Sequence, residues 1–156
     1  MNKTFTSTDG TFIFNYPNNW KLEWEEDDTL LLYRKGNLFQ RESQYSLRIS
    51  SLLVAPKDTG SQATPNNSTE IILNQLKEKY PDLQIINKDN FQVAKYKDDT
   101  VTEGDSPQSS IDVWILFTSN RKVICSFTTI KGEEYSTKAK EERAIAEDII
   151  YSIKLF

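Results

Sequence analysis

The sequence contains one serine and lysine pair at a spacing that catalysis uses. Ser119 and Lys122 fit the Ser-x-x-Lys motif of penicillin-recognising enzymes, in which both side chains lie on one helical turn. Here residues 119–122 separate two alternating apolar runs, so we expect a hairpin turn, in which the two side chains need not converge. The companion Lys-Thr-Gly and Ser-Asp-Asn motifs are absent from the sequence. We therefore interpret the pair as part of a turn.

Two groups of carboxylates could ligate a hard cation such as calcium, which prefers several oxygen ligands. One is Glu25-Glu26-Asp27-Asp28, and the other is formed by Asp98, Asp99, Glu103 and Asp105. Neither group has the spacing of an EF-hand loop. We expect solvated loops at both places, and we predict no metal site and no cofactor.

The chain contains no histidine and a single cysteine, Cys125. Catalytic triads and dyads that need histidine are therefore impossible within the chain, and so are zinc sites built from histidine or several thiolates. Cys125 lies in the alternating run Val123–Phe127, where a free cysteine behaves as a small buried hydrophobe. Catalysis by carboxylate, lysine or tyrosine side chains stays open. We predict no catalytic residue and interpret the protein as non-enzymatic.

The charge of the chain argues against a nucleic-acid partner. The net charge is −4 and the isoelectric point is about 5.0, whereas nucleic-acid binding usually needs a basic field. No apolar run approaches the roughly 18 residues that span a bilayer. Residues 1–10 also lack the apolar segment of a signal peptide. We expect no membrane span and a cytoplasmic protein if Met1 is the native start, with a removed leader as the alternative.

Alternating apolar and polar residues predict that most of the chain is β-strand. The expected strands are Thr11–Tyr16, Trp20–Glu25, Leu30–Arg34, Tyr45–Leu53, Leu83–Ile86, Phe91–Tyr96, Ile111–Thr118 and Val123–Ile130. Short turns between successive strands favour antiparallel pairing.

Two segments have the apolar spacing of helices. The first follows Asn67–Glu70, which fits both a glycosylation sequon and a capping box; we favour the cap, and Pro81 ends the helix. The second runs from about Ser136 to Ile153, and we expect the apolar C-terminus after it to dock. The order predicts an α+β domain over residues 1–156. It has a mostly antiparallel sheet of about seven to eight strands with a helix packed on each face, an α/β/α sandwich.

The predicted strand Ile111–Thr118 is apolar on both faces, which indicates a central strand covered on both sides. Val113 and Ile115 share one face and Trp114 lies on the other. We expect Trp114 in the core. An exposed Trp114 would instead be an anchor for an interface.

Two terminal motifs resemble those of the PsbP/Mog-like superfamily. Gly10–Trp20 resembles its opening aromatic strand and Tyr-Pro-x-x-Trp turn, and Ile149–Phe156 is similar to its closing Ser-[Ile/Phe]-Lys-x-Phe pattern. The resemblance spans essentially the whole chain and is closest to uncharacterised bacterial domains of the superfamily. It implies a fold. It implies no single function, because photosystem extrinsic subunits, a Ran-binding import factor and secretion chaperones share it, and it offers no catalytic motif to carry over.

We therefore expect a non-enzymatic module, an adaptor, assembly factor or chaperone-like domain, that binds a protein partner. Its expected contact surfaces are the long loops Ala55–Asn66 and Lys97–Ser110, since long loops in compact domains are usually functional. One alternative is a small-molecule-binding domain or carboxylate-based enzyme, with a pocket between the sheet and a helix and an Asp or Glu of raised pKa. Another is an immunity or inhibitor protein whose acidic surface binds a basic partner.

Overall fold

The structure of the chain is a computed structural model. It describes residues 2–26, 28–39, 41–53, 65–89, 91–98, 109–118 and 121–156, without the side chains of 52–53 and 65–69.

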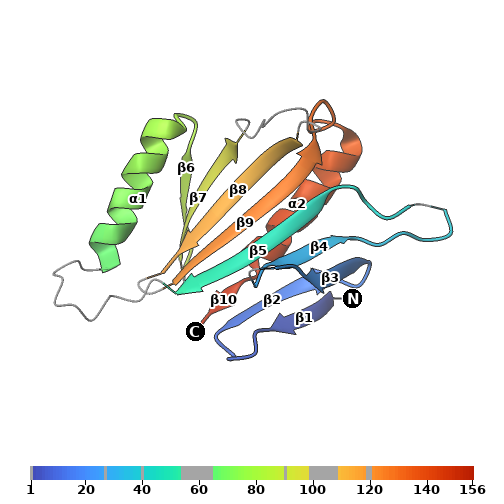
Figure 1. Ribbon diagram of the computed structural model, residues 1–156, viewed down its shortest axis with the longest axis horizontal. Helices are drawn as coiled ribbons and strands as arrows, with labels where there is room; N and C mark the ends of the chain where they lie inside the picture. The colour runs from blue at the N-terminus through green and yellow to red at the C-terminus, as the bar shows by residue number, and fades with distance from the viewer. Residues whose placement is uncertain are drawn as a thin grey trace.

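The described residues form two antiparallel sheets and two helices (Figure 1). The small sheet has the order β1-β2-β10, with β1 at Asn2–Thr6, β2 at Phe12–Pro17 and β10 at Lys154–Leu155. The large sheet has the order β3-β4-β5-β9-β8-β7-β6. Its strands are β3 Trp20–Trp24, β4 Leu30–Arg34, β5 Ser46–Leu53, β6 Gln84–Asn87, β7 Gln92–Asp98, β8 Ser109–Phe117 and β9 Arg121–Ile130. The helices are α1 Pro65–Lys79 and α2 Thr137–Tyr151.

The helix starts follow from their first residues. Ser136 caps α2, because its side-chain oxygen accepts a hydrogen bond from the backbone N–H of Ala139 over 3.1 Å. Helix α1 begins at Pro65, and proline is favoured at the first helical position. The expected cap at Asn67 is therefore wrong, since Asn67 lies inside the first turn. The helix ends before Pro81, as predicted.

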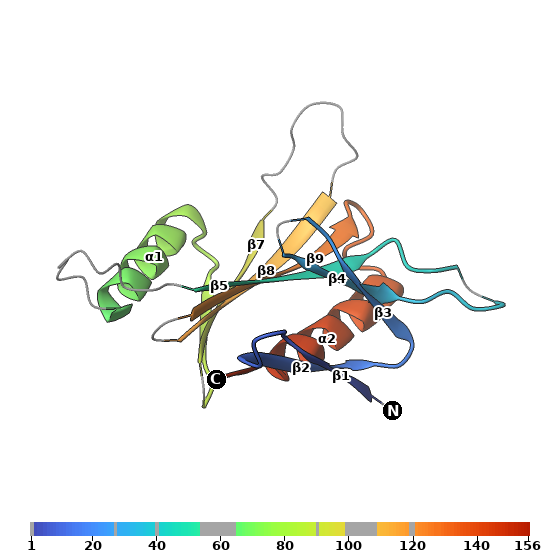
Figure 2. The same ribbon diagram turned by 60° about the horizontal axis from the view of Figure 1, so that its bottom comes forward.

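The helices cover opposite faces of the large sheet (Figure 2). Trp114 and Leu116 of β8 pack in one core with Ile149 of α2, whereas Val113 of the same strand packs in a second core with Leu73 of α1. Trp114 is completely buried, which confirms its predicted place in the core. The α+β class, the antiparallel sheet and the helix on each face are all confirmed. Neither described helix is long and apolar enough to cross a membrane.

The sequence predicts one sheet, whereas the structure has a second, small one. The strand expected at Thr11–Tyr16 forms as β2, but it pairs with β1 and β10 and not within the large sheet. The small sheet closes the open side of α2, so that α2 lies between the two sheets (Figure 2). Phe14 of β2 is fully buried against this core. The C-terminus docks as expected, because β10 pairs with β2 and the Phe156 N–H donates to the Thr11 carbonyl over 2.8 Å. Part of each terminal motif, β2 of the opening motif and β10 of the closing motif, therefore pairs in the small sheet.

Candidate functional site

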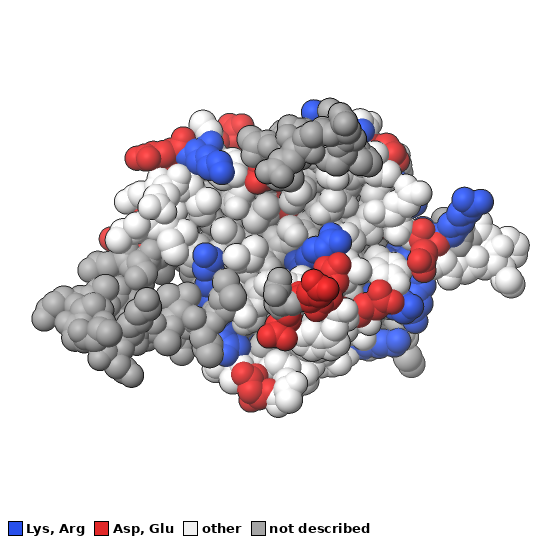
Figure 3. Space-filling model, viewed as in Figure 1, with Lys and Arg blue, Asp and Glu red and all other residues white. Residues whose placement is uncertain are grey.

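The loop between β4 and β5 carries two hydrophobic side chains that are almost wholly exposed. Leu38 is 97% exposed and Phe39 is 93% exposed. The Phe39 N–H donates to the side-chain oxygen of Asn37 over 2.8 Å, which shapes the turn at the tip. The loop projects well beyond the sheets in Figure 1. In Figure 3 uncharged atoms lie at the end of this projection and charged side chains lie nearer its base.

Buried polar groups hold the base of this loop. The Arg34 guanidinium donates to the carbonyl of Lys35 over 3.0 Å and to that of Arg41 over 3.1 Å, so it links the two arms of the loop. It also lies 3.6 Å from a carboxylate oxygen of Glu142 in α2. Ser43, on the returning arm, donates from its hydroxyl to the other oxygen of Glu142. The loop is thus attached to α2 through a carboxylate that is only 3% exposed.

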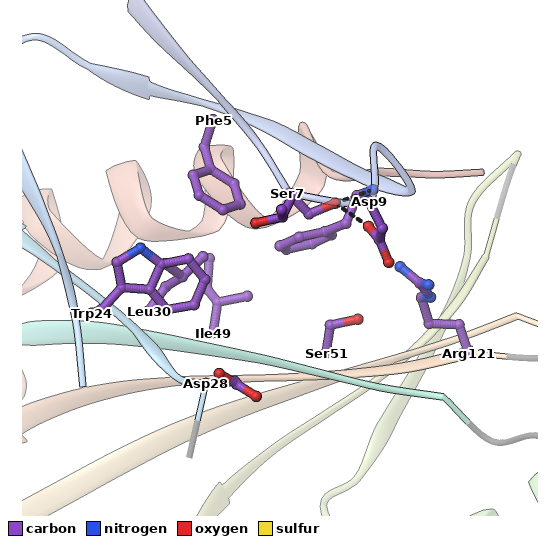
Figure 4. Close-up of a pocket in the computed structure, with 11 residues that line it drawn as sticks. Phe5, Ser7, Asp9, Trp24, Asp28, Leu30, Ile49, Ser51 and Arg121 are labelled. Atoms are coloured by element: carbon purple, nitrogen blue, oxygen red, sulfur yellow. Dashed lines mark hydrogen bonds between the residues drawn. The ribbon is translucent and has the colours of Figure 1, made fainter. Parts of the chain in front are cut away.

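A pocket of about 400 Å³ lies between the small sheet and the large sheet (Figure 4). Its apolar wall is an aromatic cluster in which Phe5 contacts Phe12 and Trp24 edge-on, each at 6.0 Å between ring centroids. These rings come from β1, β2 and β3. The opposite end of the pocket is polar and contains Asp9, from the β1–β2 turn, and Arg121, the first residue of β9.

The Asp9 carboxylate is held by one of its two oxygens. Oδ1 accepts hydrogen bonds from the Ser7 hydroxyl over 2.6 Å, the Thr11 hydroxyl over 2.7 Å and the Thr11 N–H over 3.1 Å. These bonds, Ser7 foremost, hold the pKa of Asp9 well below its usual range, and the charge of Arg121 adds to the effect. Asp9 is therefore an anion at neutral pH, with Oδ2 directed toward Arg121 (Figure 4).

Arg121 is a buried cation at the edge of the pocket. The residue is only 7% exposed, yet its guanidinium forms no ion pair at 4.0 Å or less with any carboxylate in the described part of the chain. Its backbone is fixed by the turn, since the Thr118 N–H donates to the Arg121 carbonyl over 2.9 Å. A guanidinium that lines a pocket and has no carboxylate partner among the described residues is a potential anion-binding group.

The residues singled out in the sequence are dispersed. Glu25 pairs with Arg48 at 2.8 Å and Asp28 lines the pocket, so these two acids of the first cluster do not converge. Asp98 ends β7, while Asp99, Glu103 and Asp105 lie outside the described residues, as does Asp27. Among the described residues no group of three or more acids or cysteines could hold a metal ion.

Several other predictions concern the turns and loops. Lys122 lies in β9, and Ser119 is outside the described residues. The two loops predicted as contact surfaces lie mostly outside the described residues, at 54–64 and 99–108. Cys125 is fully buried, as predicted, and burial raises the pKa of its thiol.

The pocket differs from the one expected for a carboxylate-based enzyme. It lies between two sheets rather than between a sheet and a helix. The carboxyl pKa shifts that the structure resolves, at Asp9, Glu23 and Glu134, are all downward. None of these three carboxyls has the raised pKa that the enzyme alternative requires.

The sequence does not predict the loop tip or the pocket. Leu38-Phe39 is an apolar pair inside the polar run 35–44, and Arg121 is a lone charge at the head of an apolar strand. These are weak signals, because burial and pairing depend on the fold.

The sheet order and the two helices give the chain an α+β fold that is similar to that of cyanobacterial PsbP, which confirms the PsbP/Mog-like resemblance at the level of the fold. The chain is similar to cyanobacterial PsbP of Synechocystis, with 11% identity, a TM-score of 0.56 and coverage of 99% of this chain and 92% of that chain. It is also similar to a Bacteroides thetaiotaomicron protein of known crystal structure, with 21% identity and a TM-score of 0.64. That match covers 99% of this chain and 48% of the other, so the chain spans about half the length of that relative.

The chain belongs to the family described as Domain of unknown function (DUF3805), whose profile matches residues 1–156. A comparison with curated proteins finds no match.

Proposed function

We propose that this domain is a non-enzymatic binding module that recognises a protein partner by inserting Leu38 and Phe39 into an apolar cleft of that partner. The observation that carries the proposal is the near-complete exposure of two adjacent hydrophobic side chains at the end of a projecting loop. Burial of apolar surface in an interface stabilises the complex by about 25 cal/mol per Å². A few anchors that enter well-packed, desolvated pockets of the partner supply most of the binding energy in protein interfaces.

The base of the loop supports this role. Arg34 links both arms, and Glu142 connects them to α2 through buried groups. A loop attached in this way loses less conformational entropy on binding than a free loop does. The fold places the tip away from both hydrophobic cores, so its exposure does not reflect incomplete packing.

The test is site-specific photocrosslinking from the tip. A photoreactive phenylalanine analogue replaces Phe39, and the protein is irradiated in lysate of the organism that encodes it. We expect one predominant crosslinked protein, and the purified partner should bind the wild-type domain directly. The Leu38→Ser/Phe39→Ser variant should lose that binding while keeping the wild-type circular dichroism and melting temperature.

Ile71→Ser is the matched control, since Ile71 is also an exposed hydrophobic residue but lies on α1. It should bind the partner as the wild type does. If the tip variant binds as tightly as Ile71→Ser does, the loop is not the recognition element and the proposal fails. Sedimentation of the domain with phospholipid vesicles, lost in the tip variant, would assign the tip to a lipid surface instead and would also overturn it.

The same experiment also tests the alternative that the protein is an immunity or inhibitor protein. A basic partner whose affinity falls steeply with added salt would favour it, because complementary charges at an interface are screened by salt. The cytoplasmic location stays a prediction, which fractionation of the native organism tests.

A further inference from the structure

The pocket between the two sheets presents opposite charges side by side. The charge of Arg121 lowers the pKa of Asp9. Their nitrogen and oxygen atoms nevertheless lie farther apart than the 4.0 Å that defines an ion pair. Each therefore retains capacity for a ligand. Asp9 uses only Oδ1 in the hydrogen bonds of its turn, and the Arg121 guanidinium is unpaired among the described carboxylates.

Such a pair fits a zwitterion whose two charges are on neighbouring atoms. A ligand carboxylate can form a bidentate contact with a guanidinium, and a ligand ammonium can donate to a carboxylate oxygen. An α-amino acid carries both groups on one carbon, so both contacts can form at one end of the pocket. Its side chain then extends toward the aromatic wall of Phe5, Phe12 and Trp24.

We propose that this pocket binds a free α-amino acid with an apolar or aromatic side chain. The carboxylate lies on Arg121, the ammonium lies on Asp9 Oδ2, and the side chain packs on the aromatic cluster. The volume of about 400 Å³ is within the range of small-molecule sites. The aromatic rings add apolar burial and favourable ring geometry for an aromatic side chain.

The lining charges argue against simpler ligands. Asp9 and Asp28 are acidic and Arg121 is basic, so the formal charge of the pocket lining is −1. A simple anion would meet this net negative charge, and a simple cation would leave the Arg121 guanidinium without a counterion. A zwitterion supplies a negative group for Arg121 and a positive group for Asp9. The low pKa of Asp9 keeps its side of the site charged throughout the neutral range.

Trp24 provides the signal for the test. It is 58% exposed and lines the pocket, whereas Trp20 and Trp114 are completely buried. Ligand binding should therefore change the fluorescence of Trp24 alone, and Trp24→Phe should remove the change. Titration calorimetry with L-leucine, L-methionine and L-phenylalanine measures the affinity independently of fluorescence.

Three compounds separate the charge contacts. L-phenylalanine carries both charges, 3-phenylpropionate lacks the ammonium, and 2-phenylethylamine lacks the carboxylate. We expect L-phenylalanine or one of its apolar relatives to bind at least about tenfold more tightly than either truncated compound, because each charged hydrogen bond contributes a factor of that order. Equal binding of the amino acid and a truncated compound overturns the proposal. So does the absence of binding by all three amino acids.

Two variants test the residues. Asp9→Asn keeps an oxygen for Ser7 and Thr11 but removes the charge, and Arg121→Met removes the guanidinium while preserving much of the side chain. Each should weaken amino-acid binding about tenfold or more, whereas Lys131→Gln, at an exposed residue away from the pocket, should not. Asp9→Asn should leave the affinity for 3-phenylpropionate unchanged or higher. Wild-type affinity in either pocket variant overturns the proposal. The melting temperature shows whether each variant is folded.

The site is independent of the loop tip. The variant Leu38→Ser/Phe39→Ser should bind the amino acid as the wild type does, so failure of either proposal leaves the other unaffected.

Discussion

The indole Nε1 of Trp114 donates a hydrogen bond to Oε2 of Glu147 over 2.9 Å, and so links the centre of the large sheet to α2. Lys95 of β7 donates to the same oxygen over 2.7 Å. Glu147→Leu should destabilise the domain by about 1–3 kcal/mol, because the buried indole N–H loses the carboxylate acceptor. Urea denaturation followed by far-ultraviolet circular dichroism measures the change.

Glu147→Gln is the matched control. It keeps an oxygen for Trp114 while removing the charge that Lys95 uses, so its loss of stability should be smaller. Equal losses in the two variants would mean that the hydrogen bond to the indole contributes nothing of its own.

The buried pair of Arg34 and Glu142 leads to a second prediction. Arg34→Met leaves Glu142 as a buried carboxylate without its cation, and we expect a loss of roughly 3–5 kcal/mol. The double variant Arg34→Met/Glu142→Met should recover part of this loss, since it removes the isolated charge. Denaturation of the wild type, both single variants and the double variant yields the coupling energy.

Arg48→Met serves as the control for that cycle. Its ion pair with Glu25 has the shorter separation, 2.8 Å, but its side chains are 40% and 33% exposed. Exposed pairs contribute about 0–1 kcal/mol, so this substitution should cost much less than Arg34→Met. A similar cost at both places would contradict the argument from burial.

The larger part of the fold can be predicted from the sequence because its signals are local. Alternation marks the strands of the large sheet, and the two-sided apolar pattern around Trp114 correctly indicates a strand covered on both faces. The strand β1 has no such signal, because Phe5 is its one hydrophobic side chain and its other residues are polar and exposed. The strand β10 consists of two residues, so only its pairing with β2 defines it.

The candidate site could not be predicted, because its parts meet only in the folded chain. Asp9 belongs to a turn of the small sheet and Arg121 to a strand of the large one, and no spacing in the sequence relates them. From their residue types alone, Leu38 and Phe39 would likewise be placed in the core. Their exposure follows from the path of the β4–β5 loop, which depends on Arg34 and Glu142.

The burial of Cys125 leads to a third prediction. The thiol is completely buried and burial raises its pKa, so the reactive thiolate is scarce in the folded protein. A disulfide reagent such as Ellman's reagent should not react with the native domain at neutral pH. In denaturant the single cysteine should react fully. Rapid reaction under native conditions would show that the core around β9 opens readily, contrary to the packing.

The contact between Tyr80 and Tyr96 leads to a fourth prediction, on the dependence of stability on pH. The rings stack at 4.2 Å between centroids and join the end of α1 to β7. Burial, with a smaller effect of Tyr80, raises the pKa of Tyr96 to about 12 from the ordinary value of 10.0 for a tyrosine. The folded state therefore favours the neutral phenol. Its contribution to the free energy of unfolding is fully present below pH 10 and is lost as the pH rises through about 12.

Tyr96→Phe tests this assignment, because phenylalanine keeps the ring but cannot ionise. We expect urea denaturation to show a smaller loss of stability between about pH 9 and about pH 11 in the variant than in the wild type. The absorbance of tyrosinate in the folded protein should also lose a step near pH 12 in the variant. If stability falls equally in the two proteins, the other tyrosines or the lysines govern the alkaline transition, and the burial of Tyr96 has no part in it.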